Sequence, residues 1–326
     1  MAQPLSHRFE SRDLQLVATL GPNSFEAAPD LVAAGATQLR LNASHMSAKQ
    51  VFDLCRHLRA ALPKTSCVVD LQGKKMRVGA IAPTQLELGA EVILTTNPSE
   101  SDGLVVPHLG LFEQVALGEH LSFDDGRIEV CVVARESTRL VVKVERPGLL
   151  LPCKGLNRVE HPIELADLPE SDQTVMSFCQ GLEGVNFAVS FASDGSEADW
   201  VRSRAPNCRV ILKVERQEAI DNLSSLAHCA DELWICRGDL GVQLGLVELA
   251  RQVARLDPHA LEVPVLMAGQ VLEHLTQHEQ PTRSEICHLI DLVARGYAGI
   301  VLSDETAIGV GPANAVRWAA RLMREH

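Results

Sequence analysis

Short apolar runs alternate with amphipathic stretches over most of the chain. Residues 14–20 and 66–70 are short, mainly apolar runs and residues 37–41 form a further short strand candidate, which is typical of parallel strands covered by helices on both faces. The amphipathic stretches that follow end at glycine or proline, as Gly35 and Pro63 illustrate. The pattern therefore predicts three βα units at the start of the chain.

The pattern changes after residue 80. Residues 81–156 contain short strand-like segments separated by turn residues, and Asp125-Gly126 is a hairpin-type turn signal. No helix is predicted among them. We therefore expect a small all-β domain here.

The βα alternation returns after residue 157. Strands are predicted over residues 186–191, 209–214, 232–237, 263–268 and 300–303, and a single helix over residues 240–256. Three units before the β domain and five after it make eight, the number in a (β/α)₈ barrel. An open parallel sheet is the alternative, but eight short strands favour closure.

We accordingly predict an α/β fold, a (β/α)₈ TIM barrel formed by residues 1–80 and 157–326. A β-barrel-like domain, residues 81–156, is inserted after the third strand.

Charge and composition exclude some classes of function. The chain has 326 residues, and 30 basic against 42 acidic side chains give a net charge of −12. This balance argues against a general nucleic-acid binder and against a surface that prefers anionic lipid. No secretory signal and no apolar run of roughly 20 residues is visible, and nine scattered cysteines without a CxxC pair indicate reduced thiols. We expect a cytoplasmic protein that binds no membrane.

Polar residues at the carboxyl ends of the predicted strands are the candidates for chemistry, because barrel active sites lie there. Lys213 and Glu215 alternate on the fifth strand and therefore point into the same barrel mouth. Glu215 and Asp239 end adjacent strands, and two carboxylates suit a hard divalent ion such as Mg²⁺. Arg40, Lys213 and Arg77 add positive charge that suits a phosphoryl group.

Each candidate also has a purely structural interpretation. Lys213 and Glu215 could form an ion pair at a strand end. Asp239 could be only a helix cap and Asp70 could cap a turn, while His45 could stabilise a loop. The convergence of all of them on one barrel rim favours a functional site.

Taken in order along the chain, the motifs resemble the pyruvate kinase family from about residue 14 to residue 325. They are VATLGPNS, LRLNASH, VVDLQGKKMR, DDGRIEV, CKGLN, LKVE, RGDLG, PTRSE and LSDETAIG. That family carries an inserted β-domain after the third barrel strand. The resemblance implies a phosphotransferase that moves a phosphoryl group between phosphoenolpyruvate and ADP to give pyruvate and ATP, with Mg²⁺ or Mn²⁺ as cofactor.

The resemblance also implies roles for single residues. Arg40 and Lys213 would contact the transferred phosphoryl group. Glu215 and Asp239 would hold the metal, and the amides at Gly238 and Asp239 would receive the substrate carboxylate. The nucleotide phosphates would lie near Asn42, His45, Arg77 and Lys154. The last of these belongs to the β-domain, which would close as a lid and exclude water.

One departure from the family pattern concerns K⁺, which many members bind through an asparagine, a serine, an aspartate and a threonine. The first three are present as Asn42, Ser44 and Asp70. Leu71 replaces the threonine, and Lys75 stands where K⁺-dependent members carry glutamate. The Lys75 ammonium would replace the monovalent cation. With Gln72, this resembles the K⁺-independent branch, so we expect no K⁺ requirement.

A second departure follows the seventh strand. Gly269 replaces a threonine whose hydroxyl touches the substrate carboxylate and helps to relay a proton to the enolate, although the Gly269 amide remains available. Losing one such donor is expected to lower the rate by about 10²–10³-fold. Lys74 also replaces a proline, and Asp304 replaces a glycine.

Two alternatives to the kinase therefore stay open. A metal-dependent lyase, aldolase or decarboxylase acting on a 2-oxo acid needs only a metal that stabilises an enolate. A catalytically weakened regulatory protein would bind phosphoenolpyruvate or nucleotide without turnover.

The chain ends at His326, just past the eighth predicted helix. We therefore expect neither the family's C-terminal regulatory domain nor a tetramer built through it. The apolar face of the last predicted helix is compatible with the core and with a homodimer interface. It consists of Val316, Ala319, Ala320 and Met323.

Overall fold

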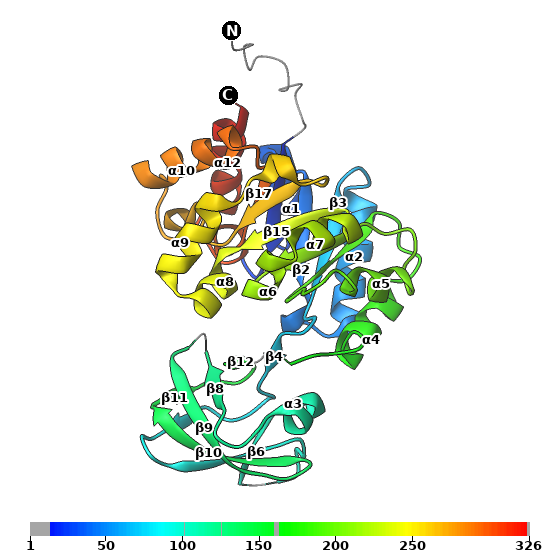
Figure 1. Ribbon diagram of the computed structural model, residues 1–326. Coiled ribbons are helices and arrows are strands. Elements are labelled where there is room, and N and C mark those ends of the chain that lie inside the picture. Colours follow the sequence, from blue (N-terminus) through cyan, green and yellow to red (C-terminus); the bar gives the residue numbers. More distant parts are fainter. Residues whose placement is uncertain (1–13, 101, 125, 160–162, 325–326) are drawn as a thin grey trace. The chain divides into compact units, whose positions relative to one another are not determined.

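The computed structural model describes residues 14–100, 102–124, 126–159 and 163–324, apart from the side chain of His45 (Figure 1). The chain divides into two compact units. Met1–Gly73 together with Pro169–His326 forms the first, and Lys74–Leu168 forms the second.

The first unit is a closed barrel of eight parallel strands, which confirms the predicted (β/α)₈ fold. The strand order around it is β1-β17-β16-β15-β14-β13-β3-β2. The strands are β1 (Gln15–Leu20), β2 (Gln38–Asn42), β3 (Ser66–Leu71), β13 (Val185–Val189), β14 (Val210–Val214), β15 (Glu232–Cys236), β16 (Val265–Ala268) and β17 (Gly299–Leu302). Every residue of β13, β14 and β15 is buried, as expected for parallel strands beneath helices.

Side chains from several strands fill the barrel. One core cluster includes Val17, Val68, Ala188, Ile211, Trp234, Leu266 and Val301. Because these side chains fill the interior of the barrel, a ligand can bind only at the rim, where the carboxyl ends of the strands lie.

Helices follow the strands around the barrel (Figure 1). They are α1 (Ala28–Ala34), α2 (Ala48–Ala61), α4 (Glu170–Cys179), α5 (Glu197–Arg202), α6 (Gln217–Asp221), α7 (Leu223–Cys229), α8 (Arg237–Leu244), α9 (Leu246–Arg255), α10 (Arg283–Ala294), α11 (Asp304–Ala307) and α12 (Pro312–Arg324). Short 3₁₀ turns are η1 (Ala43–His45), η2 (Pro258–Ala260) and η3 (Glu273–Thr276). Within the described part of the chain, no helix has both the length and the apolar character that a membrane span requires.

The prediction of one helix over residues 240–256 is wrong. Two helices, α8 and α9, meet at Gly245, whose φ of 76° lies in the left-handed region that favours glycine. In addition, α8 begins already at Arg237, directly after β15. The amides of its first turn therefore lie at the barrel rim.

The apolar face of α12 belongs to the core of the chain. The side chains of Val316, Ala319, Ala320 and Met323 are all buried. A homodimer would therefore need a different surface.

The second unit contains a seven-stranded sheet with the order β4-β12-β8-β9-β10-β6-β7, and a two-stranded sheet of β11 and β5. The strands are β4 (Met76–Arg77), β5 (Thr84–Leu86), β6 (Glu91–Thr95), β7 (Gly103–Val105), β8 (His120–Phe123), β9 (Ile128–Arg135), β10 (Arg139–Arg146), β11 (Gly148–Leu150) and β12 (Gly155–Arg158). The expectation that this segment has no helix is wrong, because α3 (Leu109–Gln114) lies within it and buries Leu111 and Phe112.

The second unit is wider than the predicted segment 81–156. β4 pairs with β12, so the chain joins this sheet already at Met76. Val78 and Ile163 pack into the same apolar core. Both ends of the unit therefore extend beyond the region in which the strand-like pattern is evident.

Candidate active site

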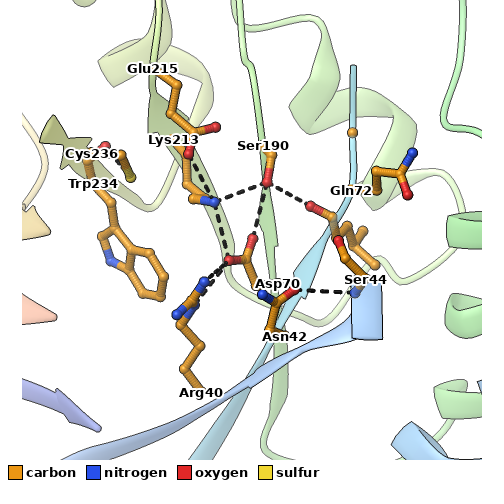
Figure 2. Close-up of polar contacts among 12 residues, drawn as sticks. Arg40, Asn42, Ser44, Asp70, Gln72, Ser190, Lys213, Glu215, Trp234 and Cys236 are labelled. Atoms are coloured by element: carbon orange, nitrogen blue, oxygen red, sulfur yellow. Dashed lines mark hydrogen bonds and ion pairs between the residues drawn. The ribbon is translucent and has the colours of Figure 1, made fainter. Parts of the chain in front are cut away.

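A network of charged and polar side chains lies at the carboxyl ends of neighbouring barrel strands (Figure 2). Arg40 belongs to β2, Asp70 to β3 and Lys213 to β14, while Ser190 directly follows β13. β2, β3, β13 and β14 are consecutive neighbours in the barrel. Strand pairing thus brings together residues that are far apart in the sequence.

Asp70 lies between the two cations of this network (Figure 2). Its Oδ2 atom lies 2.9 Å from Nε of Arg40 and 3.1 Å from Nζ of Lys213. The other end of the Arg40 guanidinium donates a hydrogen bond to Oγ1 of Thr19, at 2.8 Å. Asp70 therefore fixes both groups expected to meet the phosphoryl group, a position that the sequence pattern alone does not reveal.

The Lys213 ammonium has three oxygen partners, which matches its three N–H donors. Nζ lies 3.1 Å from Asp70 Oδ2, 2.9 Å from Ser190 Oγ and 3.0 Å from Glu215 Oε1. Burial alone would lower the pKa of Lys213, but the carboxylates of Asp70 and Glu215 outweigh burial and raise it above its usual value. Lys213 is thus a fixed, buried positive charge at neutral pH.

The same contacts determine the charge of Asp70. Burial alone would raise its pKa, but Lys213 and Arg40 outweigh burial and hold it below the usual range. The positive charges of Arg40 and Lys213 are thus neutralised by the negative charges of the Asp70 and Glu215 carboxylates. A dianionic phosphate ester could therefore be received by redistributing contacts within a preorganised set of charges.

Glu215 is held from two sides and is 1% exposed. Oε2 accepts a hydrogen bond from the backbone N–H of Phe191 at 2.8 Å, while Oε1 faces Lys213. Phe191 has a φ of 58°, an unusual conformation for a bulky residue. This turn after β13 presents its amide to the carboxylate.

Asp239 lies in the first turn of α8 and is partly exposed. Since β14 and β15 are hydrogen-bonded neighbours, Glu215 and Asp239 follow adjacent strands. Carboxylate oxygens are the ligands that Mg²⁺ and Mn²⁺ prefer. The rigid anchoring of Glu215 and the all-oxygen donor set fit a hard divalent ion.

The structure brings Gly269 against the start of α8. Its φ is 83°, and a Cβ atom at this position would lie 3.2 Å from the amide nitrogen of Gly238. The Arg237 guanidinium donates from Nε and Nη2 to the Gly269 carbonyl, at 2.9 and 2.6 Å, and from Nη2 to Gln270 at 2.8 Å. Glycine therefore leaves room beside the Gly238 amide.

Asn42 and Asp70, two of the residues that would bind a monovalent cation, have other partners. Oδ1 of Asn42 accepts a hydrogen bond from the N–H of Ser44 at 3.2 Å, and Asp70 binds Arg40 and Lys213. Leu71 offers only its backbone carbonyl, which accepts a hydrogen bond from Ser190 Oγ at 2.8 Å. Lys75 belongs to the second unit.

A cavity of about 850 Å³ opens beside this network. Its lining includes Pro22, Phe25, Arg40, Asn42, Gln50 and Asp304. It thus joins the β1–α1 connection to the loop after β2 and to the start of α11, with Arg40 shared between cavity and network. The side chain of His45 lies outside the described residues.

The two nucleotide candidates of the second unit lie near each other within it. Nη1 of Arg77 donates to the Cys153 carbonyl at 2.9 Å, and the Lys154 ammonium lies 2.7 Å from Oδ1 of Asp124. The N–H of Val78 also donates to the carbonyl of Lys154.

Sequence reasoning missed Ser190 and Thr19, and it noted Arg237 only as the first residue of the RGDLG motif, without a role of its own. Ser190 directly follows the fourth strand, so the criterion that selected the other rim residues would also have found it. Arg237 begins the RGDLG motif after the sixth barrel strand, but its contact with Gly269 depends on the loop after β16. Thr19 lies inside an apolar run, where the pattern predicts only core.

Comparison with known proteins agrees with this geometry. Residues 11–316 match the family model described as "Pyruvate kinase, barrel domain". The chain belongs to the pyruvate kinase family. This confirms the resemblance predicted from the ordered motifs.

Curated relatives include the pyruvate kinase of Mycobacterium intracellulare, 32% identical over 332 residues, which are 96% of this chain and 70% of that protein. The pyruvate kinase of Agrobacterium vitis is 30% identical over 97% of this chain and 68% of its own length. That of Borreliella burgdorferi is 26% identical over 91% of this chain and 64% of its own length. The aligned regions thus cover about two thirds of these relatives.

Proposed function

We propose that the chain is a divalent-metal-dependent phosphotransferase that moves a phosphoryl group between phosphoenolpyruvate and ADP, giving pyruvate and ATP. The observation that carries this proposal is the buried Lys213 ammonium, held at the barrel rim by Asp70, Ser190 and Glu215. Family membership supports it. Phosphoryl transfer depends mainly on positioning and charge neutralisation, which such a network supplies.

The chain's own residues would act as follows. Arg40 and Lys213 bind the phosphoryl oxygens and neutralise the charge that develops on them during transfer. The N–H groups of Gly238 and Asp239, at the start of α8, receive the substrate carboxylate. Glycine at 269 keeps the first of these amides accessible. It also supplies no hydroxyl, so the proton that converts the enolate to pyruvate would come from water.

Glu215 and Asp239 would hold Mg²⁺ or Mn²⁺. A divalent ion bound there supplies positive charge next to the anionic oxygens of the substrate. Because Glu215 Oε1 contacts Lys213 directly, metal and lysine would act on the same region of the substrate.

The cavity beside Arg40 and Asn42 is the proposed nucleotide site of the barrel, and its 850 Å³ fits a nucleotide. Asn42 and His45 are the proposed phosphate contacts from the barrel. Arg77 and Lys154 are those from the second unit, which would act as a lid.

We further propose that the enzyme needs no K⁺ and that Lys75 replaces the ion. The partners already held by Asn42 and Asp70, and the missing side-chain oxygen at Leu71, support this. A cytoplasmic location is proposed from the glycolytic role of the family.

A coupled assay with phosphoenolpyruvate, ADP and either Mg²⁺ or Mn²⁺ tests the proposal. We expect pyruvate formation that depends on both substrates and stops when the metal is chelated.

Because glycine at position 269 supplies no hydroxyl group, the second candidate function is that of a lyase or decarboxylase acting on a 2-oxo acid. Decarboxylation of oxaloacetate without nucleotide, and no phosphoryl transfer, would support that candidate. Binding of either substrate without any turnover would support a regulatory role.

A further inference from the structure

Three potential metal ligands converge on the second unit, within its seven-stranded sheet. His120, Cys131 and Glu145 come from the neighbouring strands β8, β9 and β10. One ligand atom from each residue lies within 4.8 Å of the other two, and Nε2 of His120 lies 3.3 Å from Oε2 of Glu145. Among the described residues, no other group of three or more His, Cys, Asp and Glu side chains has this spacing.

The register of β8 and β9 brings His120 and Cys131 together, and Glu145 reaches them from an irregularity in the β9–β10 register between Val144 and Arg146. His120 and Cys131 are direct cross-strand partners. Their neighbours Leu121, Val130 and Val144 point into the apolar core, so alternation along the strands sends the three candidates to the opposite face. A shift of one residue would expose the core, so the packing that stabilises the sheet also holds the cluster together.

The ligand set has the chemistry of a zinc site. An imidazole nitrogen, a thiolate and a carboxylate are all common zinc ligands, with bonds of about 2.0–2.3 Å. In a tetrahedron, such bonds place neighbouring ligand atoms about 3.3–3.8 Å apart. The 3.3 Å between His120 and Glu145 lies at the lower end of this range. Sulfur and nitrogen ligands disfavour Mg²⁺ and Ca²⁺.

Charge and access also suit a divalent ion. A thiolate at Cys131 and the Glu145 carboxylate would together cancel its two positive charges. His120 and Cys131 are half-buried and Glu145 is exposed, which leaves an entry path. Lys143 is the cross-strand partner of Cys131, and its positive charge disfavours a cation nearby. Its side chain is exposed, however, so water screens this charge. Glu129 and Arg146 on the adjoining part of the sheet pair with each other, at 2.8 Å.

We propose that His120, Cys131 and Glu145 bind one Zn²⁺ ion, with water or a small anion in the fourth position. Binding would link β8, β9 and β10 and stabilise this unit. The site is independent of Glu215 and Asp239, which offer only oxygen.

Titration with Co²⁺ in place of Zn²⁺ tests the proposal on the whole chain, with a phosphine reductant and excess Mg²⁺ to occupy the carboxylate site. A cobalt–thiolate charge-transfer band should grow to one equivalent and disappear when Zn²⁺ is added. Cys131→Ser should abolish the band and weaken Zn²⁺ binding by more than about 100-fold, since loss of even an outer-shell partner typically costs about 10–100-fold. Cys153→Ser, which alters an exposed cysteine of the same unit, should change neither.

The variants Glu145→Gln and His120→Gln keep the thiol and should retain a weakened band, with circular dichroism showing an unchanged fold. The proposal is overturned if the wild-type chain gives no thiolate band, if the band survives in Cys131→Ser, or if Cys153→Ser removes it. None of these results depends on kinase turnover.

Discussion

Nζ of Lys213 lies 3.0 Å from Oε1 of Glu215, so the proposed phosphoryl-binding cation and the proposed metal-binding carboxylate hold each other in place. Both are buried, and the Phe191 amide fixes the second oxygen of Glu215. A buried pair with this many partners is costly to break from one side. Each member is therefore expected to affect both catalysis and the position of the other.

Replacing Glu215 with glutamine tests this coupling. The amide keeps the shape but removes the negative charge that would hold the metal and that faces Lys213. We expect kcat to fall by at least about 10²-fold, with a higher Mg²⁺ requirement. Glu183→Gln, at an exposed carboxylate outside the rim network, should behave like the wild-type enzyme. Unchanged Mg²⁺ dependence in Glu215→Gln would argue against its role as metal ligand.

Asp172 predicts an unusual pH dependence of stability. This carboxyl accepts hydrogen bonds from the N–H groups of Gln72 and Gly73, at 3.1 and 2.8 Å. Burial raises the pKa of this carboxyl to about 6, because the effect of burial is larger than the opposing effect of the two hydrogen bonds. Because the folded value exceeds the unfolded value of about 3.9, its contribution to stability is full below pH 4 and is lost as pH rises through about 6.

Asp172→Asn should remove this dependence. Denaturant unfolding should show that the free energy of unfolding of the wild-type chain falls between pH 4 and pH 7.5, whereas that of the variant does not. The fall should be at most about 3 kcal/mol, the value for a shift of about two pKa units. Asp199→Asn, at an exposed position, should keep the wild-type profile. Identical profiles for wild type and Asp172→Asn would refute the assignment.

Introducing the family's threonine at Gly269 should not improve the enzyme. A side chain here meets the Gly238 amide at 3.2 Å, and the positive φ adds about 1–3 kcal/mol of strain. We expect both Gly269→Ala and Gly269→Thr to lower the melting temperature and to raise KM for phosphoenolpyruvate. The alanine variant is the control for crowding alone. Faster turnover in Gly269→Thr than in the wild-type enzyme would show that the loop accommodates a hydroxyl after all.

If the Lys75 ammonium replaces K⁺, as proposed, the rate of the enzyme should not increase when K⁺ is added. Rates measured in Na⁺-free buffer should be the same with K⁺ and with a large organic cation. Lys75→Glu should lower the activity and make the remainder respond to K⁺, because a negative charge then replaces the ammonium. Lys64→Glu, at an exposed position, provides the matched control. Many-fold activation of the wild-type enzyme by K⁺ would contradict the proposal.

The sequence reveals the barrel more completely than its site. Strands such as Val265–Ala268 are buried on all sides and therefore read as continuous apolar runs. The pattern does not reveal the break at Gly245, because apolar residues, Leu244 and Leu246, flank this single glycine on both sides. The six-residue helix α3 is too short for a periodic signal.

Within the site, the residue types at the strand ends predict which side chains gather, since adjacent parallel strands end at one rim. The partners they select there depend on tertiary structure. The central position of Asp70 requires β2, β3 and β14 to be placed around one point, and the Phe191 contact requires a left-handed turn. Neither is encoded in a local pattern.

The central claim is that Lys213 neutralises the transferred phosphoryl group. A rapid-quench single-turnover experiment measures phosphoryl transfer from phosphoenolpyruvate to ADP before enolate protonation can limit the rate. Lys213→Met should slow this step by about 10³-fold or more, while Lys64→Met leaves it unchanged. Equal transfer rates in the wild-type enzyme and a folded Lys213→Met variant would contradict the account.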